Sequence, residues 1–194
     1  PNDGIRNGTE PGIAGVVLRL FAADGAGNPT GEVLVIGYGG QNSVTTDGDG
    51  YYRFDRVPPG TYVVVVDVAA SGTVLSGLAS SAGYSTDVTT LAGDLRDHGK
   101  DTPVTLGTTL VVTNGIAGVA VELTVDGEPE GEAGPHWPYD DDNDNLLMDF
   151  GFASTHSLGN RVFADADGDA IQDVGEPGIS GVTVQLKDNG GTVV

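Results

Sequence analysis

One acidic stretch, residues 165–176 (DADGDAIQDVGE), most constrains what this chain can fold into. Oxygen-bearing side chains fall at positions 1, 3, 5, 9 and 12 of the stretch, namely Asp165, Asp167, Asp169, Asp173 and Glu176. Such closely spaced carboxylates repel one another, whereas Ca²⁺ takes about six to eight oxygens, and the backbone carbonyl of Ile171 at position 7 would add one more. The spacing predicts a calcium loop; the alternative interpretation is an Asp-rich turn without an ion.

The residues beside this loop predict strands rather than the helices that flank an EF-hand loop. Val182, Val184 and Leu186 alternate with polar residues, which is the two-residue period of a half-buried strand. At position 6, where an EF-hand loop has glycine, this chain has Ala170. The stretch therefore has the ligands of an EF-hand loop, but we expect it to join two strands.

The start of the chain repeats the sequence of this loop and of the residues that follow it. Residues 1–20 match residues 167–186 at nine of the 20 aligned positions, and Glu10 aligns with Glu176, so the repeat length is 166 residues (176 minus 10). Gly4 supplies the glycine that Ala170 lacks. The predicted ligands here are Asp3, Ile5, Asn7 and Glu10, at positions 5, 7, 9 and 12. We therefore expect the chain to begin inside a second calcium loop whose positions 1 and 3 are missing or occupied by Pro1.

These residues resemble a known family. The run 158–188 (LGNRVFADADGDAIQDVGEPGISGVTVQLKD) is similar to the opening of the B-type repeats of bacterial serine-aspartate surface proteins, a branch of the collagen-adhesin B-type (prealbumin-like) family. The first copy continues the resemblance at residues 45–66, 95–102 and 142–152, in the family's order. The resemblance implies an all-β, immunoglobulin-like (prealbumin-like) β-sandwich in tandem repeats with calcium-binding loops. It also implies bound Ca²⁺, an extracellular location at the cell surface or secreted, and use as a stalk or spacer.

On this basis we expect two segments. Residues 1–153 are predicted to be one B-type repeat that lacks its opening strand, and residues 154–194 to be a linker and the first strands of the next repeat. Strands are expected at 16–21, 32–38, 51–54, 61–68, 116–125 and 147–152 in the first segment, and at 158–164 and 182–187 in the second. Residues 71–90 show no lasting period and predict a long loop or a weakly paired edge.

Two further acidic groups are candidate calcium sites. Asp47 and Asp49 lie in TTDGDGYYRF, where they either hold an ion or form a hairpin turn that uses Asp and Gly for their backbone tolerance. Asp141 and Asp144 represent a dense acidic run at 140–149, which is either a calcium site or a solvated loop. Both interpretations stay open for each group.

Composition narrows the possible functions. With 28 acidic and 8 basic residues the formal net charge is −20, which disfavours nucleic acid and anionic membranes as partners. There is no cysteine, so bound metal rather than disulfides would stiffen the fold. The chain contains no apolar run of about 18 residues and no signal peptide, and it starts at Pro1 rather than Met, which predicts a piece of something longer and no membrane insertion in this segment.

Other chemistries are less well supported. A catalytic interpretation would make His98 a general base, but no Ser or Cys nucleophile motif accompanies it, so we predict a structural or calcium-linked loop and no enzyme. His136 and Trp137 suggest sugar stacking, although a lone Trp beside prolines is more often a packing plug. Wider relatives carry Lys isopeptide bonds, yet the counterpart of Lys187 is Phe21, so no such crosslink is predicted in residues 1–153.

The function predicted from the sequence is a non-enzymatic, calcium-binding structural repeat of a surface protein or fibre. One alternative is an adhesin module that recognises a host protein or glycan, which an exposed aromatic or apolar groove at 71–90 or 131–139 would favour. Another is an accessory module of a secreted enzyme. The expected partners are neighbouring copies of the same domain, in a tandem array or head to tail by strand exchange.

Overall fold

The computed structural model of the chain describes residues 4–6, 10–34, 41–90, 96–129, 131, 143–156 and 158–193. They divide into two units, Pro1–Thr155 and His156–Val194. The boundary predicted from the sequence lay near residue 153, and the assignment of the segments as successive repeats stays a prediction. Among the described residues, no helix has the length and apolar character needed to cross a membrane.

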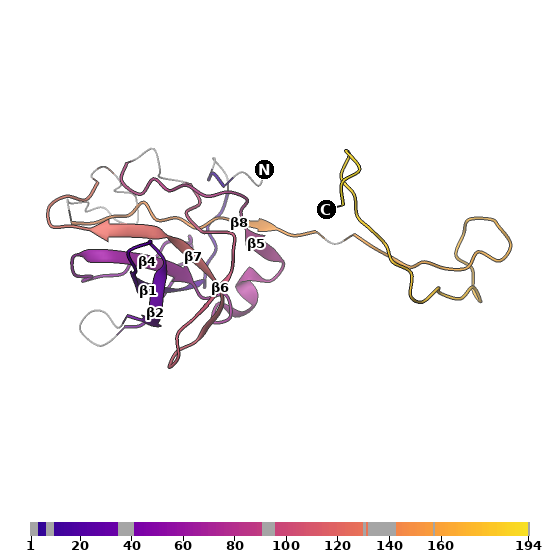
Figure 1. Cartoon of the computed structure of the whole chain (residues 1–194), viewed down its shortest axis with the longest axis horizontal. Helices are drawn as coiled ribbons and strands as arrows, with labels where there is room; N and C mark the ends of the chain where they lie inside the picture. The colour runs from indigo at the N-terminus through magenta and orange to yellow at the C-terminus, as the bar shows by residue number, and fades with distance from the viewer. Residues whose placement is uncertain are drawn as a thin grey trace. The chain divides into compact units, whose positions relative to one another are not determined.

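The first unit is built on a six-stranded sheet (Figure 1). Its strands are β1 (Val17–Ala23), β2 (Pro29–Val33), β3 (Val44–Thr45), β4 (Gly60–Val66), β6 (Val104–Leu106) and β7 (Val112–Leu123). Their order is β2-β1-β4-β7-β6, with β3 also paired to β1, and the paired strands are antiparallel. The β-branched run of β4 lies at the centre, where both of its faces are covered.

A second, smaller layer consists of β5 (Leu78–Ser80) paired antiparallel with β8 (Phe152–Ser154), preceded by the 3₁₀ helix η1 (Gly72–Leu75). The main core lies between the layers. Leu78 of β5 and Phe152 of β8 pack against this core while partly buried. Its fully buried members come from the large sheet, from η1 and from the connecting loops, and are Val16, Leu18, Leu20, Tyr62, Val64, Val66, Leu75, Val88, Ile116, Val119, Val121 and Met148. The predicted all-β, immunoglobulin-like sandwich is therefore confirmed for this unit.

The opposite face of the sheet carries a smaller cluster around Phe21, Val63 and Val65. On this face Arg19 forms a buried ion pair with Asp67, with 2.7 Å between Nε and Oδ2 and side chains 11% and 3% exposed. A buried carboxylate and a buried guanidinium need each other, because loss of one leaves the other charge uncompensated. The pair thus fixes the register of β1 against the end of β4.

Strand β7 is irregular where it pairs with β4, close to residues 98–100. β4 residues Val63 and Val65 face Ala120 and Ala117, so β7 has one extra residue between the two pairs. Such a bulge bends the strand. On its other side β7 pairs with residues 98–100, where the Val119 amide donates to the His98 carbonyl at 3.1 Å.

Several predicted strands are confirmed and others are wrong. Those at 16–21, 61–68 and 116–125 correspond to β1, β4 and β7, whereas the strand predicted at 147–152 is shifted to β8. β2 overlaps the start of the strand predicted at 32–38, and residues 35–38 of that prediction lie outside the described residues. No strand forms at 51–54. Tyr52 and Phe54 instead pack edge to face, with ring centroids 6.1 Å apart. The alternation of aromatic and other residues at 51–54 therefore reflects packing of these rings against the core and not pairing in a β-sheet. β3, β5 and β6 were missed because each has only two or three residues.

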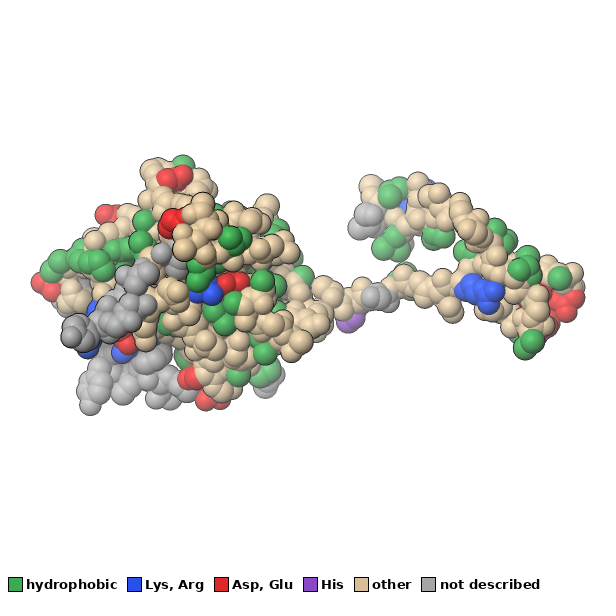
Figure 2. Space-filling view, turned by 90° about the horizontal axis from the view of Figure 1, so that it is seen from below, with side chains coloured by type: hydrophobic (Ala, Val, Ile, Leu, Met, Phe, Trp, Pro, Cys, Tyr) green, Lys and Arg blue, Asp and Glu red, His purple; other side chains and the backbone are tan. Residues whose placement is uncertain are grey.

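The second unit contains no strand among its described residues, so the strands predicted at 158–164 and 182–187 are wrong for this structure. Only isolated bridges form, Phe163–Gly178 and Lys187–Val193. Val184 is 76% exposed, whereas Leu18, its counterpart one repeat earlier, is 1% exposed. Hydrophobic side chains accordingly lie on the surface of this unit (Figure 2). The alternating pattern is present, but a strand also needs neighbouring strands and a covering layer.

Candidate functional site

The predicted calcium loop 165–176 closes a short hairpin in the second unit. Its two flanks are joined by backbone hydrogen bonds, from Ala164 to the Pro177 carbonyl (3.0 Å) and from Ile179 to the Val162 carbonyl (2.9 Å). The flanks are therefore extended chain rather than helix, in agreement with the sequence. The loop differs in this respect from an EF-hand.

Three of the predicted ligands come together in this loop. One carboxylate oxygen from each of Asp165, Asp167 and Asp169 lies within 4.8 Å of the other two, and all three residues are exposed. Asp165 accepts hydrogen bonds from the amides of Ala170 (3.0 Å) and Gly168 (2.7 Å). The Ala170 amide, followed by the Gly168 amide, lowers the pKa of Asp165, so this carboxylate stays charged at neutral pH.

Glu176 ties the two ends of the loop together. Its Oε1 accepts a hydrogen bond from the Ala166 amide (2.8 Å), and its Oε2 accepts one from the Asp173 amide (3.1 Å). The Ile171 amide donates to Asp169 (2.8 Å). Glu176 and Asp173 belong to the folded loop but not to the group of three carboxylates, and the part played by the Ile171 carbonyl stays a prediction.

The two predicted loops share an unusual backbone conformation at position 6. Gly4 has φ of +66° and Ala170 has φ of +64°. This left-handed conformation is free for glycine but costs a residue with a Cβ roughly 1–2 kcal/mol. The second loop therefore keeps the sharp turn of the first one even though its turn residue is alanine.

The first predicted loop is fastened to a distant segment. Ile5 forms an antiparallel bridge with Arg96, and the Gly4 carbonyl accepts a hydrogen bond from the Asp97 amide (2.8 Å). Glu10, the predicted closing ligand, is exposed. No sequence pattern connects residues 96–97 with this loop.

Asp47 organises a tight turn. Its Oδ1 accepts hydrogen bonds from the amides of Asp49 and Tyr51, both at 2.9 Å, and its carbonyl accepts one from the Gly50 amide (3.2 Å). A Cβ added to Gly12 would collide with the Asp49 carbonyl, so the turn lies directly against the chain that follows the first loop. This geometry fits the hairpin-turn interpretation of Asp47 and Asp49.

Three predicted ligands, Asp3, Asn7 and Asp141, lie outside the described residues. Asp144, predicted to act with Asp141, is half-buried. Within the described part of the chain, Asp144 belongs to no group of three or more acidic or histidine side chains that could hold an ion. Its role as a ligand stays a prediction.

Glu128 is a buried carboxylate that the sequence analysis missed. It is 8% exposed, its Oε1 accepts a hydrogen bond from the Thr124 amide (2.6 Å), and its Oε2 accepts one from the Asn145 side chain (3.2 Å). The Asn145 side chain also donates to the Val88 carbonyl (3.0 Å). Glu128 and Asn145 together thus link residues 124–128 to residue 145 and residue 88, and no local pattern distinguishes Glu128 from its acidic neighbours.

His98 is completely buried and clamps two backbone segments together. Its Nδ1 accepts a hydrogen bond from the Asp149 amide (3.2 Å), and its Nε2 lies 2.9 Å from the Asp87 carbonyl. Because Nδ1 accepts, the ring proton is on Nε2, which donates to Asp87. Both ring nitrogens are therefore used by the backbone, which fits the structural interpretation of this histidine.

Asp97 is 3% exposed and has one unsatisfied oxygen. Its Oδ1 accepts a hydrogen bond from the Gly99 amide (2.7 Å), whereas Oδ2 has no hydrogen-bond partner. Burial raises the pKa of Asp97 to about 6; the Gly151 and Gly99 amides oppose this rise, and the charge of Asp101 adds to it.

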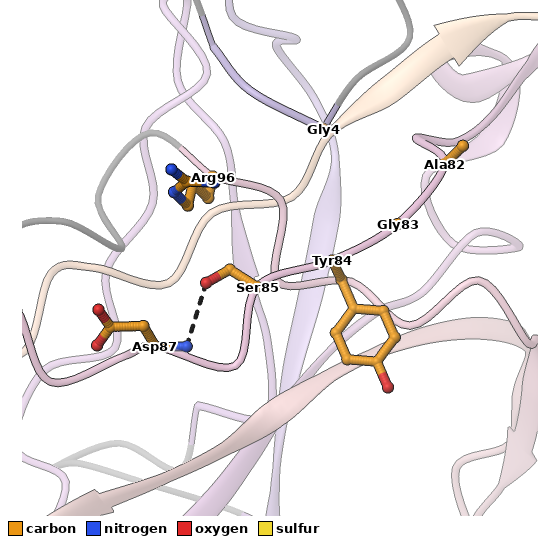
Figure 3. A pocket seen from close by; sticks show the side chains of 7 residues that line it. All are labelled: Gly4, Ala82, Gly83, Tyr84, Ser85, Asp87 and Arg96. Carbon is orange, nitrogen blue, oxygen red and sulfur yellow. Dashed lines mark hydrogen bonds between the residues drawn. The ribbon is translucent and has the colours of Figure 1, made fainter.

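The first unit contains a cavity of about 470 Å³ (Figure 3). It is lined by Gly4, Ala82, Gly83, Tyr84, Ser85, Asp87 and Arg96. The Ser85 hydroxyl accepts a hydrogen bond from the Asp87 amide (3.1 Å), and the Tyr84 ring and the Arg96 side chain point to different sides. Tyr84 is 47% exposed and also lines a second cavity of about 370 Å³.

Comparison with known proteins gives a consistent picture. The family model of the SdrD B-like domain matches residues 1–107 and 156–194. Serine-aspartate repeat-containing protein F of Staphylococcus epidermidis is 29% identical over 99% of this chain, which covers 8% of that protein. Serine-aspartate repeat-containing protein D of Staphylococcus aureus strain Newman is 31% identical over 99% of this chain, which covers 10% of that protein. The chain thus spans about a tenth of the length of these curated relatives. No solved structure matches it.

Proposed function

This chain belongs to the SdrD B-like domain family, and on that premise we propose that it is an extracellular, calcium-binding structural repeat of a bacterial surface protein or fibre. It acts as a rigid unit of a stalk or filament, at the cell surface or in a secreted protein. Its sequence similarity to serine-aspartate repeat-containing proteins supports this role.

The observation that carries the proposal is the approach of Asp165, Asp167 and Asp169 to one another. Carboxylate oxygens are the donors that a hard cation such as Ca²⁺ prefers. Glu176 already spans the loop from Ala166 to Asp173, so the donor set fits a calcium ion. When bound, the ion supplies the positive charge that offsets the mutual repulsion of these carboxylates.

The second unit has little else to hold it together. Leu158 is 86% exposed and Val184 is 76% exposed, so burial of apolar surface contributes little to its stability. Because binding to the folded state alone stabilises that state, a free Ca²⁺ concentration of 100 Kd would add about 2.7 kcal/mol. Bound Ca²⁺ would therefore be the main contribution to the stability of the folded loop.

We also propose that the chain is not an enzyme. His98, the histidine considered for base catalysis, is completely buried and uses both ring nitrogens to hold backbone groups. A general base must instead reach the proton it removes. The structural role of His98 supports a repeat whose task is mechanical.

The proposed partners are neighbouring copies of the same domain. In the second unit, residues 162–164 pair with residues 177–179, whose counterparts one repeat earlier are residues 11–13. Strand exchange would place residues 162–164 of one copy against residues 11–13 of another. The net charge of −20 argues against nucleic acid and anionic membranes as partners.

The proposal is tested by thermal unfolding of the chain with Ca²⁺ and with excess chelator, combined with its mass in solution. We expect Ca²⁺ to raise the melting temperature, and the double variant Asp165→Asn/Asp167→Asn to lose most of that increase. Glu122→Gln, which changes an exposed carboxylate on β7, is the matched control and should respond to Ca²⁺ like the natural sequence. A melting temperature that does not depend on Ca²⁺ would remove the proposal, and a mass above one chain would support strand exchange.

A second candidate function is an adhesin module, favoured by the cavity in Figure 3. The exposed Tyr84 lies in the region 71–90, where an aromatic groove was the expected mark of ligand recognition. Tyr and Arg are frequent anchors of protein interfaces, and both line this cavity. Loss of binding to host-cell extracts or glycans on Tyr84→Ala, with unchanged calcium-dependent stability, would favour this function over the structural one.

A further inference from the structure

Residues 162–164, called the exchange segment below, have two identical sequences with which they can pair. In the second unit they pair with residues 177–179, which belong to the sequence EPGI, and EPGI also stands at residues 10–13. We propose that the exchange segment pairs with its own chain while Ca²⁺ closes the loop 165–176, and with residues 10–13 of a second copy while that loop is open. The inference rests on the proposed function and adds calcium as the regulator of strand exchange.

The two pairings exclude each other. In the second unit the Ala164 amide donates to the Pro177 carbonyl (3.0 Å), and the Val162 carbonyl accepts from the Ile179 amide (2.9 Å). One edge of an extended segment pairs with one neighbouring strand at a time, because each residue has a single backbone donor and a single carbonyl. The hairpin must therefore open before the exchange segment can join a second copy.

The EPGI sequence of the first unit offers the same backbone groups. Within the described part of the chain, neither the Pro11 carbonyl nor the Ile13 amide has a hydrogen-bond partner. These groups correspond to the Pro177 carbonyl and the Ile179 amide one repeat later. Pro11 and Ile13 of one copy can therefore form, with the exchange segment of another copy, the two bonds that close the hairpin in the second unit.

Apolar burial favours the second copy. Ile13 packs against the main core of the first unit, whereas its counterpart Ile179 is 48% exposed. Val162, which lies opposite Ile179 in the hairpin, is 41% exposed. Opposite Ile13 the same side chain would lie at the margin of a formed core, and burial of apolar surface is the dominant favourable term in most protein association.

Charge also fits a second copy. In the hairpin Arg161 lies over Gly178, since a Cβ added to this glycine would be 3.0 Å from the Arg161 Nε. The space over the equivalent Gly12 is taken by the turn that contains Asp47 and Asp49, and both of these aspartates are exposed. Arg161 of a docked copy would move to the edge of this turn, beside two carboxylates. Such complementary charge steers association and fixes its register.

Closure of the loop 165–176 opposes the exchange. Glu176 accepts hydrogen bonds from the Ala166 and Asp173 amides, so it holds the end of the exchange segment beside its own EPGI sequence. A short linker gives an effective concentration on the order of 1 mM, which favours the hairpin about tenfold over a second copy at about 100 µM. Ca²⁺ that binds only the closed loop, at about 100 Kd, adds about another 100-fold. Without Ca²⁺ only the smaller factor remains, and apolar burial beside Ile13 offsets it.

The test traps the exchanged pair by a disulfide, which is specific because the natural chain has no cysteine. Full chains with Ala164→Cys and with Pro11→Cys are mixed and oxidised in excess chelator and in Ca²⁺. Ala164 lies opposite Pro177 in the hairpin, so exchange places it opposite Pro11. We expect the mixed disulfide, identified by mass spectrometry, in chelator and at least about tenfold less of it in Ca²⁺. With Val74→Cys, at an exposed residue of η1, in place of Pro11→Cys, chelator should not increase the mixed disulfide.

The mass in solution gives a second measurement, which needs no cysteine. The natural chain should have the mass of one chain in Ca²⁺ and a larger, concentration-dependent mass in chelator. Glu176→Ala removes the carboxylate that closes the loop, so this variant should assemble in Ca²⁺ as well. Asp188→Asn, which changes an exposed carboxylate of the same unit outside the loop, is the matched control and should behave like the natural sequence.

The outcomes separate this inference from the proposed function. A melting temperature that rises with Ca²⁺, together with a single-chain mass and no mixed disulfide in chelator, would overturn the inference and leave calcium binding intact. Equal amounts of mixed disulfide with and without Ca²⁺ would overturn the regulation by calcium. A larger mass in chelator without the mixed disulfide would assign the assembly to another contact and overturn the inference as well. A melting temperature independent of Ca²⁺ would overturn both proposals.

Discussion

His98 Nδ1 accepts a hydrogen bond from the backbone amide of Asp149, at 3.2 Å and across 51 residues of sequence. The His98 amide donates in turn to the Asp149 carbonyl at 2.9 Å. His98 and Asp149 are thus joined twice, once through the backbone and once through the ring. On its other side the ring reaches the Asp87 carbonyl at 2.9 Å, so one side chain holds two loops that cover the core.

Replacement of His98 by alanine should destabilise the first unit by about 2–4 kcal/mol, because it removes a buried ring and leaves two backbone groups without partners. The free energy of unfolding, measured with urea, checks this. His156→Ala is the control, since His156 is exposed in the second unit and should have an effect within about 0.5 kcal/mol. A His98→Ala variant as stable as this control would contradict the clamp.

Gly12→Ala should disrupt the contact between the chain after the first loop and the Asp47 turn. The added Cβ would collide with the Asp49 carbonyl and lie 2.8 Å from the Gly50 Cα, and backbone on both sides leaves no flexible atom to move aside. We expect a loss of about 1–3 kcal/mol, as for other overpacked sites. Gly48→Ala, in the same turn, meets no atom within 4 Å and should change the melting temperature far less; equal effects would contradict the contact.

Tyr52 should make the stability of the first unit fall in alkaline solution. Its hydroxyl donates to the Met148 carbonyl at 2.7 Å, and burial, with a smaller contribution from the charge of Asp149, raises the pKa of Tyr52 well above its ordinary 10.0. The unfolded chain therefore loses this proton first. The contribution of Tyr52 to the free energy of unfolding is fully present below about pH 10. Above that pH it falls by about 1.4 kcal/mol for each pH unit, up to the pKa of Tyr52 in the folded state.

Urea unfolding from pH 8 to 11 measures this effect as a difference between variants. Tyr52→Phe should flatten the alkaline decline, whereas Tyr84→Phe, at a residue that is 47% exposed, should leave it unchanged. A Tyr52→Phe variant that declines as steeply as the natural sequence would assign the pH dependence to other groups.

The parts of the fold that could be predicted are those with a strong local pattern. β4 is almost wholly β-branched and apolar, so its place at the centre of the sheet follows from its sequence. Tyr52 and Phe54 show the limit of this reasoning, because alternating apolar residues also occur where irregular chain covers a core. Short elements such as β6, with three residues, are set by their partner strand and leave no pattern of their own.

The candidate site shows the same division. Asp165, Asp167 and Asp169 could be predicted because their spacing within one loop brings them together. Asp97 could not, since its significance depends on its burial beside Gly4, a contact across more than 90 residues of sequence. Local spacing predicts which carboxylates of one loop come together, but only the fold shows which distant residues lie beside a loop.

Ala170→Gly should increase the Ca²⁺ affinity of the loop 165–176. Ala170 has φ of +64°, as Gly4 has +66° in the first loop, and glycine relieves the strain of roughly 1–2 kcal/mol that a Cβ causes there. Glycine also gains freedom in the unfolded chain, which offsets about 0.5–1 kcal/mol of this benefit. We therefore expect a net gain of up to about 1 kcal/mol, seen as an increase in Ca²⁺ affinity of up to roughly fivefold.

Ala166→Gly provides the control, because Ala166 lies in the same loop but has no positive φ. Glycine at that position relieves nothing and only adds freedom to the unfolded chain, so Ca²⁺ affinity should stay equal or fall. Calorimetric titration of both variants compares them directly. If Ala166→Gly improved binding as much as Ala170→Gly, general loop flexibility rather than the left-handed turn would govern the affinity, and the correspondence between Ala170 and Gly4 would have no energetic meaning.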